Sequence, residues 1–397
     1  MSRPRSSDGR KVVIVNAEKD HPDEAEAGVA SEHGTTSGKR HMPEDFSISL
    51  ATTREEERSS SGPVTERRQS MRGFEDTYID IIDYIVRITH RIWEEKDVGY
   101  IYDTYSSTSR VFDDYGLQHG SEKIVADTVH TINAFPDIEL YADEIIWAGD
   151  DEVGFHTSHR TLITGHNTGF SRYGPPTGRE ITCWCIANCV SLANEIFDEW
   201  VIYDTASLLQ QLGHDLPEMA RELGNQADVD TPNDLRSGEP ERLPSQGKPP
   251  HLSLAHTGRF DVEDFIRVTY HNIWNRRMLG TVRDAYAPEL GFRGSTNRVF
   301  QGRGEYQAFI LSMLAMFPDL ALQVDDVYWM GNDEEGHLSS VRWSFVGTHS
   351  GMGVYGPPTG RQISMWGISQ HKIKDGQILE ELMLFNEFAV MQQIFKD

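Results

Sequence analysis

The chain has 397 residues and a formal net charge of −25. Its length allows two or three domains, and its acidity argues against nucleic acid as a partner, because a negative surface repels phosphate backbones. No stretch approaches the roughly 20 apolar residues that cross a bilayer, so the composition predicts a soluble protein without a membrane partner.

The first 72 residues are rich in Ser, Glu, Arg and Gly, with one short apolar run from Lys11 to Val15. Such a segment buries too little surface to offset the entropy lost on ordering, so residues 1–72 are predicted to form a disordered tail. No apolar core follows the early arginines, and the segment is therefore not expected to be a signal peptide.

The string Tyr-Gly-Pro-Pro-Thr-Gly-Arg occurs twice, at residues 173–179 and again at residues 355–361. Other strings around it recur at an offset of 181 or 182, such as Phe-Pro-Asp at 135–137 and 317–319. This period is far longer than the roughly 20–50 residues of solenoid and propeller repeats. It therefore indicates two divergent copies of one domain.

We expect the two copies in residues 73–213 and residues 259–397. Residues 214–258 carry Pro, Gly, Ser and charge and are predicted to be a linker, with a helical turn around residues 216–223. The first copy holds 8 basic and 24 acidic residues, the second 13 and 17, so the copies have diverged on their surfaces. This difference in charge is consistent with two copies that no longer have the same function.

Each copy is predicted to open with helices and to continue with strands. Ile81, Ile85, Ile88 and Ile92 recur at helical spacing, and a second helix is expected at 121–134 and, in the other copy, at 305–316, ending before Phe-Pro-Asp. The period then changes to two. Strands are expected at 138–147, 153–165, 180–190, 195–203, 320–329, 337–348, 362–373 and 377–385.

Helices followed by an antiparallel meander predict an α+β class, with each curved sheet wrapped by helices into a cone around a pocket. The repeated string joins two long strands in each copy. Its prolines cannot donate ladder hydrogen bonds and its glycines permit positive φ, so we expect a rigid loop at the mouth of the cone.

The three cysteines, Cys183, Cys185 and Cys189, fall within one predicted strand. Their odd number and close spacing argue against a disulfide framework. No histidine stands at ligand spacing beside them, so no metal site is expected. Reduced thiols indicate a cytoplasmic protein.

The motifs together resemble the SnoaL-like polyketide cyclase family, also called ester cyclases, of the nuclear-transport-factor-2-like superfamily. The resemblance rests on Gly-Thr-His-Ser-Gly at residues 347–351, on the repeated string, and on the closing stretch from Asp204 to Gly213. It implies a cone-shaped α+β barrel, commonly dimeric, without metal or organic cofactor. It also implies an intramolecular aldol closure in which Asp204 acts as acid and base, assisted by a histidine.

The two copies do not share that pair of groups. Asn386 stands where Asp204 has its counterpart, and an amide cannot take up a proton at useful pH. The motif histidine is His349 in the second copy, but Asn167 holds its position in the first, where His166 is shifted by one residue. A shift of one residue in a strand moves a side chain to the opposite face.

The first copy offers another histidine in the same strand. By alternation, His159 shares a face with Thr161 and Ile163. The corresponding face of the second copy is apolar, so we expect this face to line the pocket and His159 to lie opposite Asp204. The alternative is that His159 and His166 are ordinary, partly exposed strand residues.

Asp204, His159 and His166 are therefore the candidate catalytic residues. A proton next to a carbonyl is removed by a carboxylate whose pKa is raised by burial, while a neutral histidine, tyrosine or arginine stabilises the enolate. The candidate substrate-binding residues are Arg160, Trp184, Tyr203, His349, Arg342, Trp343 and Asn386.

The leading hypothesis is a cofactor-independent lyase, isomerase or cyclase that acts on a small apolar or carboxylated metabolite in the first copy. The second copy would be a degenerate half of an intrachain pseudo-dimer, and further homo-oligomerisation stays open. The alternative is a non-catalytic protein that binds small molecules in two pockets. A weaker third hypothesis is hydration or hydrolysis by water activated at Asp204.

Overall fold

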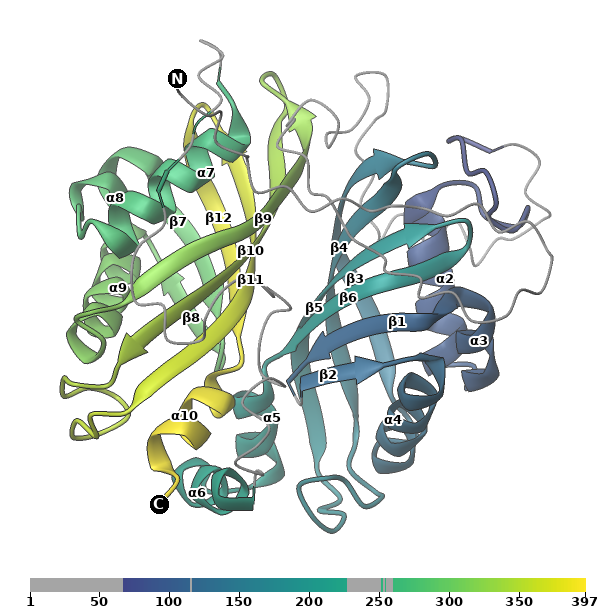
Figure 1. The fold of residues 1–397 in the computed structure, drawn as a ribbon, viewed down its shortest axis with the longest axis horizontal. Helices are drawn as coiled ribbons and strands as arrows, with labels where there is room; N and C mark the ends of the chain where they lie inside the picture. Colours follow the sequence, from purple (N-terminus) through teal and green to yellow (C-terminus); the bar gives the residue numbers. More distant parts are fainter. Residues whose placement is uncertain (1–66, 115, 227–250, 253, 255–259) are drawn as a thin grey trace, which may run out of the picture.

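The computed structural model describes residues 67–114, 116–226, 251–252, 254 and 260–397. It contains two six-stranded sheets that lie next to each other, each with helices on the side away from the other sheet (Figure 1). The predicted α+β fold with two tandem units is confirmed. We call the first sheet with helices α2–α5 domain 1, and the second sheet with helices α7–α10 domain 2.

Domain 1 has the strand order β2-β1-β6-β5-β4-β3, in which β1 runs parallel to β6 and every other pair of neighbouring strands is antiparallel. Its strands are β1 (Tyr105–Asp113), β2 (Gly116–His119), β3 (Glu139–Asp150), β4 (Gly154–His166), β5 (Glu180–Leu192) and β6 (Glu195–Tyr203). Its helices are α2 (Ile81–Trp93), η2 (Val98–Tyr100), α3 (Ile101–Thr104), α4 (Ser121–Ala134) and α5 (Thr205–Leu212).

Domain 2 repeats this plan in the order β8-β7-β12-β11-β10-β9. Its strands are β7 (Tyr286–Gly294), β8 (Arg298–Gln301), β9 (Ala321–Asn332), β10 (Gly336–Thr348), β11 (Gln362–Lys374) and β12 (Gln377–Phe385). Its helices are α7 (Val262–Tyr270), the π-helical turn η3 (His271–Asn275), α8 (Gly280–Ala285), α9 (Arg303–Met316) and α10 (Glu387–Phe395). Equivalent strands of the two domains begin 181 or 182 residues apart.

Local sequence explains where the helices begin and end. The Asp80 side chain caps α2 by accepting from the Asp83 backbone N–H, and the isoleucine stripe of this helix is buried. Helix α4 ends at Phe135 because Pro136 follows it. No helix was expected at the position of α5. Asp204 is instead the N-cap of α5.

The outer faces of the two sheets pack against each other. Alternation along β5 turns Cys183, Cys185 and Cys189 to the inside of domain 1 and turns Ile186 and Val190 towards domain 2. The shared apolar cluster consists of Phe112, Ile186, Val190, Trp200, Ile202, Trp366, Ile368, Leu382 and Leu384. Both faces of the central strands are therefore buried, which explains their nearly continuous apolar sequences.

Polar groups also cross this interface. The Gln370 side chain donates to the backbone oxygen of Ser158 over 3.1 Å, and Asn188 donates to the Ser340 hydroxyl over 3.2 Å. The guanidinium of Arg342 lies 4.2 Å from the centre of the Trp200 ring. The two domains are thus joined by specific contacts as well as by apolar burial.

The ends of the predicted tail and linker are ordered in part. Met71, at the end of the predicted tail, is 1% exposed. Helix α6 (Leu216–Gln226) lies in the predicted linker and packs against α10. Residues 1–66 and 227–250, which make up most of the predicted tail and of the predicted linker, lie outside the described residues.

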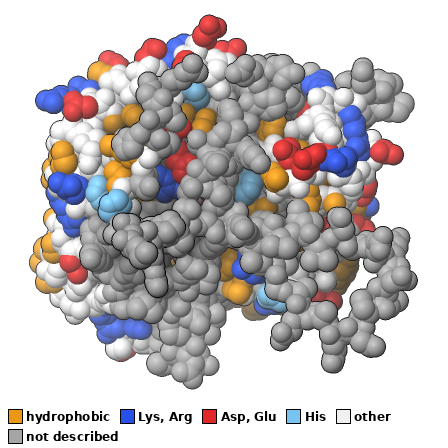
Figure 2. Space-filling view, turned by 45° about the horizontal axis from the view of Figure 1, so that its top comes forward, with side chains coloured by type: hydrophobic (Ala, Val, Ile, Leu, Met, Phe, Trp, Pro, Cys, Tyr) orange, Lys and Arg blue, Asp and Glu red, His pale blue; other side chains and the backbone are white. Residues whose placement is uncertain are grey.

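Two findings concern the surface of the described residues. None of their helices is both long and apolar enough to cross a membrane. Acidic and basic side chains are interspersed around the described edges of one face of the molecule (Figure 2).

Candidate active site

A cavity of about 640 Å³ lies inside domain 1, between the inner face of the first sheet and helices α2 and α4. This volume is in the range of small-molecule sites. Most of the lining is apolar and includes Ile85, Ile88, Ile92, Ile124, Phe135, Ile138, Ile163, Ile181, Val201 and Leu208. The free thiols of Cys183, Cys185 and Cys189 line it as well.

The carboxyl group of Glu199 faces this apolar interior from the middle of β6, and Asp113 and Asp127 also belong to the lining. The Glu199 carboxylate accepts a hydrogen bond of 2.9 Å from the Tyr105 hydroxyl, and both residues line the cavity. Burial raises the pKa of Glu199 to about 7, although hydrogen bonds from Tyr105 and Cys189 act in the opposite direction. Among the described residues no Lys, Arg or His forms an ion pair with it, so burial dominates.

His159 lines the same cavity from β4, together with Thr161 and Ile163. This is the strand face that we expected to line the pocket, but Asp204, which we expected opposite His159, is not among the described lining residues. Burial lowers the pKa of His159 to about 4, so its imidazole is neutral near pH 7. Its Nδ1 is buried and has no hydrogen-bond partner among the described residues, which leaves one ring nitrogen available to a ligand.

The repeated string forms part of the rim. Asn167 holds the loop in place, because its backbone oxygen accepts from the Gly178 N–H over 2.8 Å and its side-chain oxygen accepts from the Thr177 N–H over 2.8 Å. A Cβ at Gly169 would lie 1.8 Å from the Asn133 carbonyl oxygen, so only glycine fits there. The held loop places Arg172 and other residues before the string at the cavity.

His349 does the same for the second copy of the string. Its backbone oxygen accepts from the Gly360 N–H over 2.9 Å, and its Nδ1 lies 3.2 Å from the Thr359 hydroxyl. The motif histidine and Asn167 therefore share a loop-holding position, in which either side chain satisfies the loop. This differs from the substrate contact expected for His349.

Asp204 does not lie among the described residues that line the cavity. It is 1% exposed and sits at the interface with domain 2, where its carboxylate accepts from the backbone N–H groups of Thr296 and Asn297 over 2.6 and 3.0 Å. Burial raises the pKa of Asp204, and these backbone donors lower it. The predicted catalytic role of Asp204 thus has no geometric support in the cavity.

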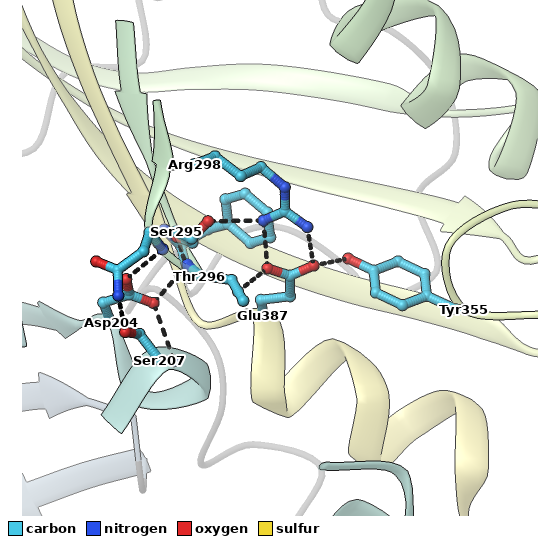
Figure 3. A network of polar contacts seen from close by, with 9 residues as sticks. Asp204, Ser207, Ser295, Thr296, Arg298, Tyr355 and Glu387 are labelled. Atoms are coloured by element: carbon cyan, nitrogen blue, oxygen red, sulfur yellow. Dashed lines mark hydrogen bonds and ion pairs between the residues drawn. The ribbon is translucent and has the colours of Figure 1, made fainter. Parts of the chain in front are cut away.

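Figure 3 shows the polar network that continues from Asp204 into domain 2. The Thr296 hydroxyl donates to the Glu387 carboxylate, which also accepts from Arg298 over 2.6 Å and from the Tyr355 hydroxyl over 2.8 Å. Tyr355 belongs to the second copy of the repeated string. The interface carboxylate is therefore connected to that loop.

The structure places most other predicted site residues outside the cavity. His166 pairs with Asp137 on the surface at 2.6 Å, because the one-residue shift turns it outwards. Arg160 pairs with Asp143 at 2.5 Å, on the opposite strand face from His159. Of the predicted catalytic and binding residues, only His159 and Tyr203 are among those that line the cavity.

The remaining predicted residues lie at the interface or inside domain 2. Trp184 faces domain 2, with the Arg293 guanidinium 5.2 Å from its ring centre. Arg342 is 1% exposed against Trp200. Trp343 fills the core of domain 2 and donates to the Ser369 hydroxyl over 3.1 Å, while Asn386 caps α10.

Eight positions that line the cavity in domain 1 carry larger side chains in domain 2, and these are buried in its core. With the domain 1 residue first, the pairs are Thr89/Tyr270, Val111/Phe292, Ile124/Tyr306, Thr131/Met313, Ala134/Met316, Thr161/Trp343, Ile163/Phe345 and Cys183/Met365. The interior of domain 2 is occupied by its own side chains at every one of these positions.

The comparisons with known proteins agree with this architecture. Residues 265–394 match the family model of the SnoaL-like polyketide cyclases. Domain 2 is a SnoaL-like domain. The likeness of domain 1 rests on its fold, which has the same strand order as that SnoaL-like domain. No curated protein matches the chain.

Several solved structures are similar to about one third of the chain. One of them is a Jannaschia sp. CCS1 protein described as a SnoaL-like polyketide cyclase. It is 20% identical to this chain, the match covers 35% of this chain and 97% of the Jannaschia chain, and the TM-score is 0.31. IdmH from Streptomyces antibioticus is 24% identical (33% and 96%, TM-score 0.28). TsrD from Streptomyces laurentii is 21% identical (34% and 98%, TM-score 0.30).

The sequence reasoning missed Glu199, although a signal was present. Glu381 stands at the equivalent position of the SnoaL-like domain 2. Glu199 lies on the same strand face as Tyr203, which lines the cavity, and Glu381 lies on the same strand face as Phe385, which belongs to the core of domain 2. The described residues hold no group of three or more His, Cys, Asp or Glu arranged for a metal ion.

Proposed function

We propose that this chain is an enzyme that removes a proton next to the carbonyl of a small apolar molecule held in the cavity of domain 1. Glu199 is the base. The observation that carries the proposal is a buried carboxyl group, without an ion-pair partner among the described residues, that faces an apolar cavity. With a pKa of about 7, it is half ionised near neutral pH, where a general base works best.

The surrounding groups supply the other half of the reaction. The Tyr105 hydroxyl orients the Glu199 carboxylate. His159 on β4 pairs with Ala187 on β5, and Ala187 pairs with Val201 on β6. Val201 lies two residues beyond Glu199 on the same strand. Strands lie about 4.8 Å apart, so the Cα atoms of His159 and Glu199 are separated by roughly 10–12 Å. A flat ligand fits between the two side chains.

The proposed step moves one proton and one electron pair. Glu199 takes the proton from the carbon next to the carbonyl, and the electron pair of that bond moves to the carbonyl oxygen as an enolate. The neutral His159 ring can donate a hydrogen bond to this oxygen. In a cyclase, the enolate carbon then attacks a second carbonyl of the same molecule, and the alkoxide that forms takes the proton from Glu199. In an isomerase, Glu199 returns the proton to a different carbon of the conjugated enolate.

We also propose that the two domains arose by duplication and form an intrachain pseudo-dimer in which domain 2 is degenerate. Support comes from the identical strand orders, the offset of 181 or 182 residues and the larger side chains inside domain 2. A fused pair can lose one site and keep its interface. The three buried free thiols fit a reducing compartment, and we propose a cytoplasmic location on that basis.

A second candidate is a binding protein without catalysis. It is favoured by Glu381, which occupies the position of Glu199 in the filled domain 2 and accepts from the Tyr270 hydroxyl over 3.1 Å. A carboxyl group at this position can therefore serve packing alone.

Hydrogen–deuterium exchange separates the two candidates without knowledge of the natural substrate. The protein is incubated with 1-tetralone, an apolar bicyclic ketone, in D₂O, and loss of the proton signal next to the carbonyl is followed by NMR. We expect Glu199→Gln to slow the catalysed exchange by about 10²-fold or more, while the matched variant Glu381→Gln keeps the wild-type rate. Equal rates for Glu199→Gln and wild type would leave only the binding protein.

A further inference from the structure

We infer that Asp204 is a positioning residue through which domain 2 sets the wall of the domain 1 cavity. The inference deepens the proposed function, since it takes that cavity to be the ligand site. It gives the carboxylate at the end of β6 a task that requires no contact with the ligand.

Asp204 lies where the wall of the cavity turns from strand to helix. Its two neighbours, Tyr203 and Thr205, line the cavity, as does Leu208 one turn later. The Asp204 N–H donates to the Trp184 oxygen over 2.9 Å, and its oxygen accepts from the Leu208 N–H over 3.0 Å. A displacement of Asp204 therefore moves three lining residues together.

Domain 2 holds this residue from outside domain 1. Thr296 and Asn297 have φ values of 60° and 53°, and their successive N–H groups converge on the Asp204 carboxylate. The Asn297 side chain also donates to the hydroxyl of Ser207, in the first turn of α5. One turn of domain 2 thus fixes the start of a domain 1 helix (Figure 3).

The reciprocal contact explains why domain 2 has an amide at the equivalent position. Asn386 meets the backbone oxygen of Asp114 and donates to it over 3.3 Å. A carboxylate cannot donate to a carbonyl oxygen, whereas an amide can, and two backbone N–H groups are best met by a carboxylate. Acid at 204 and amide at 386 therefore each match the backbone group that the other domain presents.

A neighbouring pair supports this reading, because acid and hydroxyl have exchanged places between the domains. In domain 1 the Thr205 hydroxyl donates to the Asp114 carboxylate, and in domain 2 the Thr296 hydroxyl donates to the Glu387 carboxylate. At the offset of 182, Asp114 is equivalent to Thr296 and Thr205 is equivalent to Glu387. In domain 1 the small Thr205 lines the cavity, while in domain 2 Glu387 binds Arg298 and Tyr355.

The test measures Nile red, a neutral apolar fluorophore, binding to the full chain. Asp204→Asn keeps a helix-capping side chain but replaces one acceptor oxygen by a donor that faces a backbone N–H. We expect it to weaken Nile red binding by about 5-fold or more, the usual scale of coupling between sites. The exchange of 1-tetralone at saturation should keep the wild-type pH dependence, since Glu199 is intact.

The matched control is Gln370→Ala, which also removes hydrogen bonds across the interface. Its partner Ser158 lies within β4, which is held by strands on both sides, so Nile red affinity should stay within about 2-fold of wild type. If Asp204→Asn does not fold, Asn297→Gly keeps the positive φ and removes only the bond to Ser207, and a smaller loss is expected.

Three results would overturn the inference. Wild-type Nile red affinity in Asp204→Asn is the first, an equal loss in Gln370→Ala is the second, and loss of exchange at saturation with unchanged affinity, which would make Asp204 the acid, is the third. The proposed function fails if Glu199→Gln exchanges the protons of 1-tetralone at the wild-type rate. That result does not change the Nile red affinities, so the two failures can be told apart.

Discussion

The two domains have the same strand order and the same loop at the rim, but differ in their interiors. Domain 1 encloses about 640 Å³, and eight positions that line this cavity with Thr, Val, Ile, Ala or Cys carry Trp, Phe, Tyr or Met in domain 2. The fold of the shell therefore does not depend on whether its interior is hollow. We propose that the hollow domain is kept for a ligand and the filled domain for stability and contact.

The equivalent glutamates of the two domains, Glu199 and Glu381, also differ in their surroundings. Glu199 faces the cavity, with the pKa raised to about 7 by burial. Its counterpart Glu381 is bonded to Tyr270 and lies 3.4 Å from Nε2 of His371, which stands where domain 1 has Cys189. One carboxyl group is exposed to a ligand space, and the other is enclosed by partners of its own domain.

The largest effect is expected from emptying the filled domain. Trp343→Thr copies the domain 1 residue, removes a fully buried indole and leaves the Ser369 hydroxyl without its donor. We predict a loss of about 3–5 kcal/mol in the free energy of unfolding, measured by urea denaturation. A change below about 1 kcal/mol would contradict the tight packing of domain 2.

The reverse substitution should close the hollow domain. Thr161→Trp copies Trp343 and places an indole in the cavity. We predict that Nile red affinity falls by about 100-fold, because the ligand volume is occupied. Thr182→Trp, at an exposed position of β5, serves as a control for added tryptophan. Retained affinity in Thr161→Trp would place the ligand elsewhere.

Glu199 should make the stability depend on pH. Its pKa is about 7 in the folded state against 4.5 when unfolded, so the folded state holds the extra proton between these values. Stability therefore falls as pH rises through this window and is flat above it. Between pH 5 and pH 8 we predict that wild type loses about 2 kcal/mol more than Glu199→Gln. Parallel pH curves for the two proteins would contradict the raised pKa.

The smallest effect is expected at His166. It lies on the surface with Asp137 and does not line the cavity. We predict that His166→Ala leaves both the melting temperature and Nile red affinity unchanged within error, since exposed ion pairs contribute little. His159→Ala in the same strand is the comparison, and equal behaviour of the two variants in the binding assay would count against the face assignment.

Much of the fold could be predicted from the sequence because its signals are local. The eight predicted strands end within three residues of the observed strand ends, and β6 and β12 have the predicted bounds. Strands β1, β2, β7 and β8 were not predicted. Strand β1 pairs in parallel with β6, almost a hundred residues away, and its polar start, Tyr105-Ser-Ser-Thr-Ser, gives no clear period.

The site was harder because it depends on how the two domains meet. The Asp-x-x-Ser spacing from Asp204 to Ser207 was a visible signal for a helix cap. That the carboxylate also meets the Thr296 and Asn297 N–H groups follows from packing between the domains, which one sequence does not specify. His159 was placed correctly because strand alternation is a local property.

The central claim is that the ligand of this protein sits in domain 1 against Glu199. The most direct test is a crystal structure of the protein with 1-tetralone bound. We predict electron density for the ketone inside the domain 1 cavity, between Glu199 and His159, and none inside domain 2. Density for the ketone in domain 2 or between the domains, with the domain 1 cavity holding only water, would contradict the account.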